Sequence, residues 1–128
     1  MIYDWRVKFN QPDLMFLFVQ LAPSTQLGDF VGLRAAQMVA LQLPKVGYSV
    51  AVDIGDISSP MGSIHPRRKQ EVGRRLSLEA RRIAYGESSL VSTGPVLASV
   101  APGTDDPNTL VVAYLLRAMR VTFHVARC

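Results

Sequence analysis

The sequence predicts an α/β fold with parallel strands, followed by a β-like C-terminal extension. Two short runs, residues 14–21 (LMFLFVQL) and 48–53 (YSVAVD), are almost wholly apolar, as strands covered on both faces are. Residues 30–43 lie between them and have the composition of a helix. Strand, helix and strand with short connections form a βαβ unit, which implies parallel pairing and a right-handed crossover.

The first helix is expected to begin after Asp29 and to end before Pro44. Asp29 is a residue type that caps helix N-termini, because its carboxylate accepts a hydrogen bond from a free backbone N–H of the first turn. Leu33, Gln37 and Leu41 recur at helical spacing. Pro44 cannot continue a helix, so the second strand follows directly.

A second helix is predicted from Pro66 to about Tyr85, with Gly86 as its stop. Its apolar stripe recurs every three or four residues and consists of Val72, Leu76, Ala80 and Ile83. Two sets of arginines recur every seven residues: Arg67, Arg74 and Arg81 opposite this stripe, and Arg68, Arg75 and Arg82 beside it. Glu71 and Arg75, and Arg75 and Glu79, are spaced for ion pairs. This is the pattern of an amphipathic helix that lies on a sheet.

The chain changes character after residue 87. Ser, Thr, Gly, Pro and Asp punctuate residues 88–109, and residues 110–116 form another β-like run. Residues 117–128 mix basic and apolar side chains without a firm period. We therefore expect two parts, residues 1–87 and residues 88–128, with a linker near residues 88–95.

Composition excludes several classes of protein. With 128 residues, 48% of them hydrophobic and 19% charged, the chain fits one globular domain and not a disordered one. Its longest apolar run, residues 110–116, is far shorter than the roughly 20 residues that span a bilayer. Cys128 stands alone and the two histidines have no metal-ligand spacing, so neither a disulfide nor a metal or other cofactor is expected.

The net charge of +4 is concentrated on one segment. Seven of the 14 Lys and Arg residues lie between positions 67 and 82. No aromatic side chains alternate with them, which a surface that stacks nucleic-acid bases would need. The basic residues are therefore interpreted as the solvated face of a helix, and no nucleic-acid partner is expected.

His65 is the candidate catalytic residue. It follows the loop that leaves the second strand, and ligand sites in open α/β sheets lie beyond the carboxyl ends of the strands. A histidine before a helix tends to stay neutral, as a general base must be. Asp53 and Asp56 are the nearest carboxylates that could orient its ring. A histidine that caps the helix or fills a polar loop fits the same position.

The sequence offers no catalytic nucleophile to partner this histidine. It contains no Gly-x-Ser-x-Gly and no Gly-Asp-Ser motif. Ser58, Ser59 and Ser63 lie on the loop before His65 and are read as turn residues. Taken alone, these residues describe half of an active site.

Several segments in order resemble the sialate O-acetylesterase family. They are GDFVGLRAAQ at residues 28–37, VAVDIGD at residues 50–56, and SIHPRRKQEVGRRL at residues 63–76, with the Ile-His-Pro-x-x-Lys-Gln block inside the last. FVQLAP at residues 18–23 and AYG at residues 84–86 extend the match. The resemblance covers about two thirds of the chain.

The resemblance implies a serine-dependent carbohydrate esterase that removes O-acetyl groups from sialic acids or related acetylated sugars, without a cofactor. It implies the C-terminal portion of an SGNH-hydrolase domain, a flavodoxin-like α/β/α sandwich of which this chain would hold a part. The family's general base corresponds to His65. Many SGNH enzymes carry Asp three residues before that histidine, where this chain has Gly62, so the orienting group is Asp53, Asp56 or a backbone carbonyl. Gln20 and Ser63 are the candidate substrate-binding residues.

The resemblance also implies a missing part. The family's nucleophilic serine lies in an N-terminal Gly-Gln-Ser-Asn block, which this sequence lacks. We therefore expect a fragment that is inactive alone, or else a non-catalytic truncated or split-gene chain whose partner is the missing N-terminal half of the domain. Family members are lysosomal, secreted or periplasmic, and the start MIYDWR shows no signal-peptide pattern.

Overall fold

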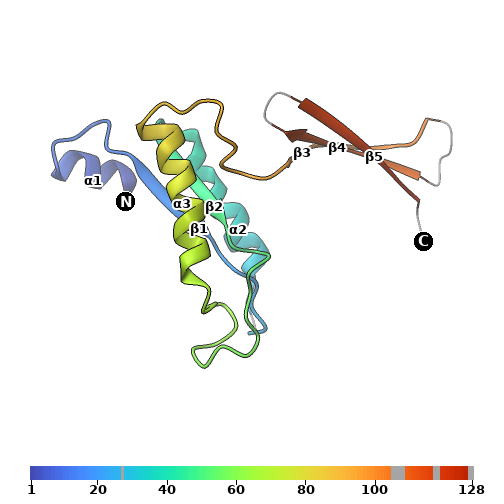
Figure 1. Ribbon diagram of the computed structural model, residues 1–128, viewed down its shortest axis with the longest axis horizontal. Helices are drawn as coiled ribbons and strands as arrows, with labels where there is room; N and C mark the ends of the chain where they lie inside the picture. The colour runs from blue at the N-terminus through green and yellow to red at the C-terminus, as the bar shows by residue number, and fades with distance from the viewer. Residues whose placement is uncertain (27, 105–108, 117–118, 127–128) are drawn as a thin grey trace. The chain divides into compact units, whose positions relative to one another are not determined.

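The computed structural model describes residues 1–26, 28–104, 109–116 and 119–126 (Figure 1). The chain divides into two compact units, residues 1–93 and residues 94–128. The first unit contains α1 (Ile2–Lys8), β1 (Phe16–Gln20), α2 (Phe30–Met38), the 3₁₀ helix η1 (Val39–Gln42), β2 (Val46–Val50) and α3 (Lys69–Ala84). The second contains β3 (Val96–Pro102), β4 (Thr109–Leu116) and β5 (Met119–Ala126).

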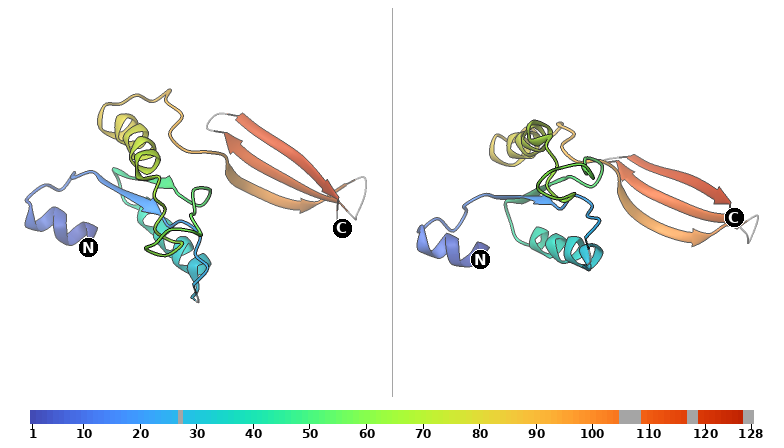
Figure 2. Two further views of the ribbon diagram at one scale, coloured as in Figure 1. Left: turned by 60° about the horizontal axis from the view of Figure 1, so that its bottom comes forward. Right: turned by 90° about the horizontal axis from the view of Figure 1, so that it is seen from below.

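The predicted parallel βαβ unit is confirmed. β1 and β2 pair in parallel, with Phe16 opposite Val46 at one end and Gln20 opposite Val50 at the other. α2 and α3 lie on opposite sides of these strands, so the first unit has helix, sheet and helix layers (Figure 2). A small cluster of Ala22, Ala51 and Ile54, packed with Val19 and Val72, forms the apolar core where the strands end.

α2 begins at the expected residue and changes from α-helical to 3₁₀ geometry near its end. Asp29 Oδ1 accepts a 2.7 Å hydrogen bond from the Gly32 N–H, which confirms the predicted cap. The predicted helix of residues 30–43 is α-helical to Met38 and continues as the 3₁₀ turn η1.

The side chain of Gln37 joins α2 to the first strand. Its Nε2 donates to the Val19 carbonyl at 2.9 Å, and its Oε1 accepts from the Leu21 N–H at 3.1 Å. Phe16 and Gln20 bond toward β2, and the direction of backbone groups alternates along a strand, so Val19 and Leu21 point to the other edge of β1. The Gln37 amide therefore satisfies strand groups that β2 does not reach.

α3 starts three residues after the expected position. Pro66 is buried but precedes the helix, and Lys69 is the first helical residue. The Arg67 N–H and guanidinium both donate to Asp56, which holds this connection away from helical geometry. The helix ends at Ala84, and Gly86 follows with φ of +70°, a conformation that suits glycine.

The face of α3 that lies on the sheet carries both apolar and charged side chains. The predicted stripe residues are half-buried, and Glu79 is more deeply buried, with 2% of its surface exposed. Glu79 accepts from Arg82 Nε at 3.1 Å. The predicted pair of Glu71 and Arg75 is present at 2.8 Å. Arg75 also donates to Asp53, and the structure pairs Glu79 with Arg82.

Carboxylates neutralise most of the basic segment. Five of its arginines form ion pairs: Arg67 with Asp56, Arg74 with Glu71, Arg75 with Asp53 and Glu71, Arg81 with Glu87, and Arg82 with Glu79. Most of the basic side chains in this segment are therefore held by carboxylates of the same chain.

The helix α1 was not among the elements predicted from the sequence. Its Arg6 is 8% exposed and donates to the carbonyls of Leu14, at 3.0 and 3.1 Å, and Pro44, at 2.6 Å. Trp5 packs edge-on against Phe16, with ring centroids 5.8 Å apart. These contacts attach α1 to the segments that lead into β1 and β2.

The second unit is a three-stranded antiparallel sheet in the order β3-β4-β5. Of these strands the sequence predicted β4, and β3 and β5 are additional. Every residue of β3 is exposed, and a β-bulge lies between Leu97 and Ser99. Within the described residues, no helix has the length and apolar character needed to cross a membrane.

Candidate functional site

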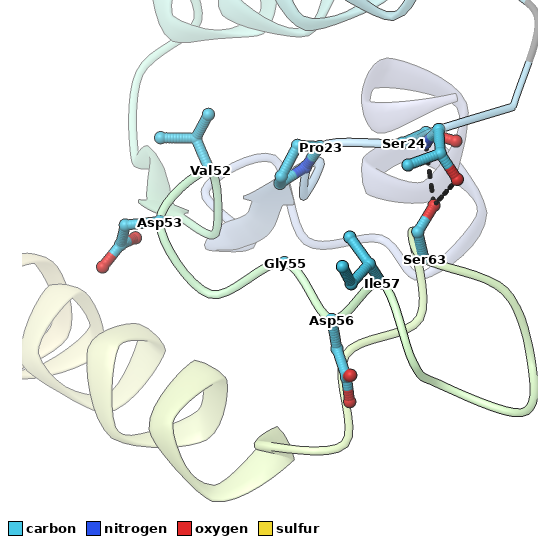
Figure 3. A pocket seen from close by; sticks show the side chains of 9 residues that line it. Pro23, Ser24, Val52, Asp53, Gly55, Asp56, Ile57 and Ser63 are labelled. Atoms are coloured by element: carbon cyan, nitrogen blue, oxygen red, sulfur yellow. Dashed lines mark hydrogen bonds between the residues drawn. The ribbon is translucent and has the colours of Figure 1, made fainter.

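The candidate site lies where β1 and β2 end. Two loops leave these carboxyl ends: the one after β1, which carries Ser24 and Thr25, and the one after β2, which carries Asp53 to His65. They surround two hollows of about 240 and 250 Å³. Figure 3 shows the first, lined by residues of both loops. Parallel α/β sheets place ligand sites at this end of the strands.

His65 lines the second hollow, which is mostly apolar. Val19, Leu21, Ala22, Ala51, Ile64, Pro66, Lys69 and Val72 form the rest of its wall. The His65 side chain is exposed, and among the described residues its ring has no hydrogen-bond partner. His65 is thus an exposed residue in the wall of an apolar hollow, and a base that meets an incoming hydroxyl must be accessible in this way.

The loop that carries His65 is closed by its own hydrogen bonds. The His65 N–H donates to the Gly62 carbonyl at 2.9 Å, and the Gly62 N–H donates to the Ser59 carbonyl at 3.1 Å. Ser59 Oγ donates to the His65 carbonyl at 2.7 Å. Gly62 has φ of +96°, which a side chain would strain. The backbone of His65 is thus fixed from both sides.

Asp53 binds an arginine of α3. Its two carboxylate oxygens accept from Arg75 Nη1 at 2.6 Å and Nη2 at 2.7 Å. These hydrogen bonds hold the pKa of the Asp53 carboxyl below its usual value. Arg75 Nη1 also donates to the Val50 carbonyl at 2.7 Å, at the end of β2. The pair therefore connects the end of β2 to α3.

Asp56 binds the arginine two residues after His65. Arg67 donates to it from Nε at 2.7 Å and from Nη2 at 3.1 Å. These bonds, with one from the Ser58 hydroxyl at 3.0 Å, lower the pKa of the Asp56 carboxyl to about 2. The two ends of the His65 loop are joined in this way.

The two candidate substrate-binding residues differ in accessibility. Ser63 is 5% exposed, and its Oγ accepts from the Thr25 N–H at 2.8 Å and lies 3.0 Å from Thr25 Oγ1 (Figure 3). It ties the loop after β2 to the loop after β1. Gln20 is half-buried at the end of β1, and within the described chain its side chain has no hydrogen-bond partner.

Three residues that sequence reasoning did not assign support this site: Ser59, Thr25 and Arg75. No local pattern identifies them, because their partners His65, Ser63 and Asp53 lie 6 to 38 positions away. Among the described residues, no group of three His, Cys, Asp or Glu side chains could hold a metal ion.

Comparison with known proteins identifies relatives. No family model matches the chain. It is 51% identical to the sialate O-acetylesterase of Homo sapiens and 40% identical to that of Mus musculus, each across 75% of the chain. Among solved structures, a carbohydrate acetylesterase from Xanthomonas citri superposes with a TM-score of 0.73, at 36% identity and over 92% of the chain.

The match covers a small part of each relative. It accounts for 21 to 22% of the curated relatives' length and 27% of the solved chain. The chain therefore spans about a fifth of the length of the curated proteins it matches. Similarity in both sequence and fold confirms the resemblance and the α/β fold class.

Proposed function

Because this chain is a relative of the sialate O-acetylesterases, which are carboxylic ester hydrolases, we propose that it supplies the histidine half of a carbohydrate esterase site. The observation that carries the proposal is the position of His65. This exposed residue lines a hollow at the carboxyl ends of β1 and β2, on a loop fixed by internal hydrogen bonds. The substrate is an O-acetylated sialic acid or a related acetylated sugar.

The mechanism requires a nucleophilic serine that a separate polypeptide supplies. His65 accepts the proton of the serine hydroxyl as its oxygen attacks the acetyl carbonyl. The imidazolium then gives this proton to the departing sugar oxygen, and an acetyl-serine remains. His65 next deprotonates a water molecule, which attacks the acetyl-serine and releases acetate. The proton returns to the serine, and the site is restored.

Asp53, Asp56, Gln20 and Ser63 have supporting roles in the proposal. Asp56 is the favoured acid partner of His65, since its arginine lies two residues after the histidine on the same closed loop. Asp53 is the second candidate. Gln20 has an unbonded amide at the end of β1 and is the better placed substrate ligand, whereas the Ser63 hydroxyl already binds Thr25.

An acetyl ester assay tests the proposal. The isolated chain should hydrolyse p-nitrophenyl acetate little faster than buffer, because loss of one member of a catalytic unit removes most of its effect. Supplying a polypeptide with the Gly-Gln-Ser-Asn block should restore turnover, and His65→Gln should lower it by about 10²–10⁴-fold. His124→Gln is the matched control. Restored turnover that is insensitive to His65→Gln would refute the assignment.

The second candidate is a non-catalytic chain that needs a partner polypeptide. Large apolar side chains on α2 and η1 are exposed, among them Val31 at 72% and Val39 at 60%. Single exposed apolar side chains are common on protein surfaces, but several that share one element can form a surface for a partner. Sedimentation and urea denaturation of the chain distinguish the cases: a monodisperse monomer that unfolds cooperatively argues against a required partner, and self-association argues for one.

A further inference from the structure

The hydroxyl of Ser59 makes the side-chain contact that fixes the backbone of His65. Ser59 is 9% exposed, and its Oγ donates to the His65 carbonyl at 2.7 Å. The same oxygen accepts from the Met61 N–H at 3.3 Å. The hydroxyl thus uses its donor and an acceptor site within one loop and links the turn at residues 59–62 to the histidine.

We propose that Ser59 is a positioning residue for His65. The inference rests on the proposed function, in which the His65 ring must meet a serine hydroxyl within hydrogen-bond distance. The backbone from which the ring projects is restrained by two hydrogen bonds, from the His65 N–H to the Gly62 carbonyl and from the Ser59 hydroxyl to the His65 carbonyl. A misplacement of about 1 Å can cost about 100-fold in rate, so a restraint next to the base matters to the reaction.

The neighbouring serines do not share this role. Ser58 Oγ donates to Asp56 and accepts from Arg67, so it closes the ends of the loop. Ser63 Oγ binds Thr25 and joins this loop to the one after β1. Among these three serines, the described structure shows a side-chain hydrogen bond to His65 itself from Ser59. The structure therefore separates the functions of three residues that sequence alone leaves equivalent.

The first test measures the restraint in the isolated chain. In Ser59→Ala, the carbonyl ¹³C signal of His65 should move upfield, because the carbonyl loses a donor. Exchange of the His65 N–H should accelerate about five-fold, the factor that corresponds to one neutral hydrogen bond. Ser59→Thr keeps the hydroxyl and should restore both values. Ser77→Ala is the matched control, since Ser77 Oγ also donates to a backbone carbonyl, that of Arg74 at 2.7 Å.

The second test measures the consequence for catalysis, in the chain supplied with the serine-bearing polypeptide. Ser59→Ala should lower kcat for p-nitrophenyl acetate with KM nearly unchanged, and Ser59→Thr should recover it. A general loss of stability would instead accelerate amide exchange throughout the first unit. Exchange that is uniform, or kcat that is unchanged while the carbonyl signal moves, would overturn the inference. Absence of His65-dependent turnover in the wild-type assembly refutes the proposed function and leaves the exchange result standing separately.

Discussion

Arg75 of α3 holds the carboxylate of Asp53 through two parallel hydrogen bonds of 2.6 and 2.7 Å. Arg75 also donates to the Val50 carbonyl and to Glu71. One side chain thus connects the last residue of β2, the loop that leads to the candidate site, and the first turn of α3. Asp53, a candidate acid for His65, thereby has a structural contact that its sequence position did not indicate.

Removal of this arginine should destabilise the first unit. Arg75→Gln breaks charge-assisted hydrogen bonds to Asp53 and Glu71 and the bond to Val50, and we expect a loss of about 1–3 kcal/mol in the free energy of unfolding. Urea denaturation measures it. Arg74→Gln is the control, because Arg74 is exposed and, among the residues that the structure describes, its side chain pairs with Glu71 and no other carboxylate. Equal losses in the two variants would contradict the role of Arg75.

Acid should weaken the fold below about pH 4. Hydrogen bonds from Arg67 lower the pKa of Asp56 to about 2, those from Arg74 and Arg75 lower that of Glu71 to about 2, and Arg75 lowers that of Asp53. A carboxyl whose pKa is lower in the folded chain stabilises it above the unfolded pKa, near 4, and this contribution is lost as pH falls toward about 2.

The urea midpoint measures this pH effect. It should fall between pH 5 and pH 2, and the fall should be smaller in high salt, because all three ion pairs are at least partly accessible to solvent and salt screens them. Arg75→Gln should show a smaller fall than the wild type, since Asp53 and Glu71 lose a donor. A midpoint that rises on acidification would show that the sign is wrong.

Replacement by alanine should have opposite effects on stability at two glycines. A Cβ at Gly47 in β2 would lie 2.5 Å from Ile83 Cδ1 and 2.6 Å from Glu79 Cγ of α3. Gly47→Ala should therefore destabilise by about 1–3 kcal/mol through overpacking. Gly73 in α3 has open space around it, so Gly73→Ala should stabilise by up to about 1 kcal/mol through helix propensity. Thermal unfolding of both variants checks the contrast, which a stabilising Gly47→Ala would contradict.

Replacement by alanine should affect stability differently at two buried serines. Ser49 in β2 is 1% exposed, and among the described residues its Oγ has no hydrogen-bond partner. Ser49→Ala removes an unsatisfied hydroxyl and should be neutral or stabilising by up to about 1 kcal/mol. Ser63→Ala removes the bonds to Thr25 and should cost about 1 kcal/mol. Urea denaturation of both variants measures the changes in the free energy of unfolding. A marked loss of stability in Ser49→Ala would contradict the prediction and indicate a partner for the Ser49 hydroxyl.

Local patterns in the sequence determined the βαβ unit, the Asp29 cap, the α3 stripe and the pair of Glu71 and Arg75. Each of these depends on residues within a few positions of one another, where periods of two and 3.6 residues decide which side chains share a face. The same reasoning missed α1, whose Arg6 is anchored by carbonyls 8 and 38 positions away. It also missed β5, although Val121, Phe123 and Val125 alternate with polar residues in the sequence.

In the candidate site, too, the sequence predicted local features and the tertiary structure determined the long-range contacts. The sequence by itself placed His65 on a loop after a parallel strand, and the resemblance gave it a role. The tertiary structure decided what surrounds it: Ser59 on its carbonyl, Arg67 on Asp56, Arg75 on Asp53, and Thr25 on Ser63. These hydrogen bonds form only when the fold brings separate loops together at the ends of two strands. The partners lie 6 to 38 positions apart in the sequence, so no local periodicity predicts the contacts.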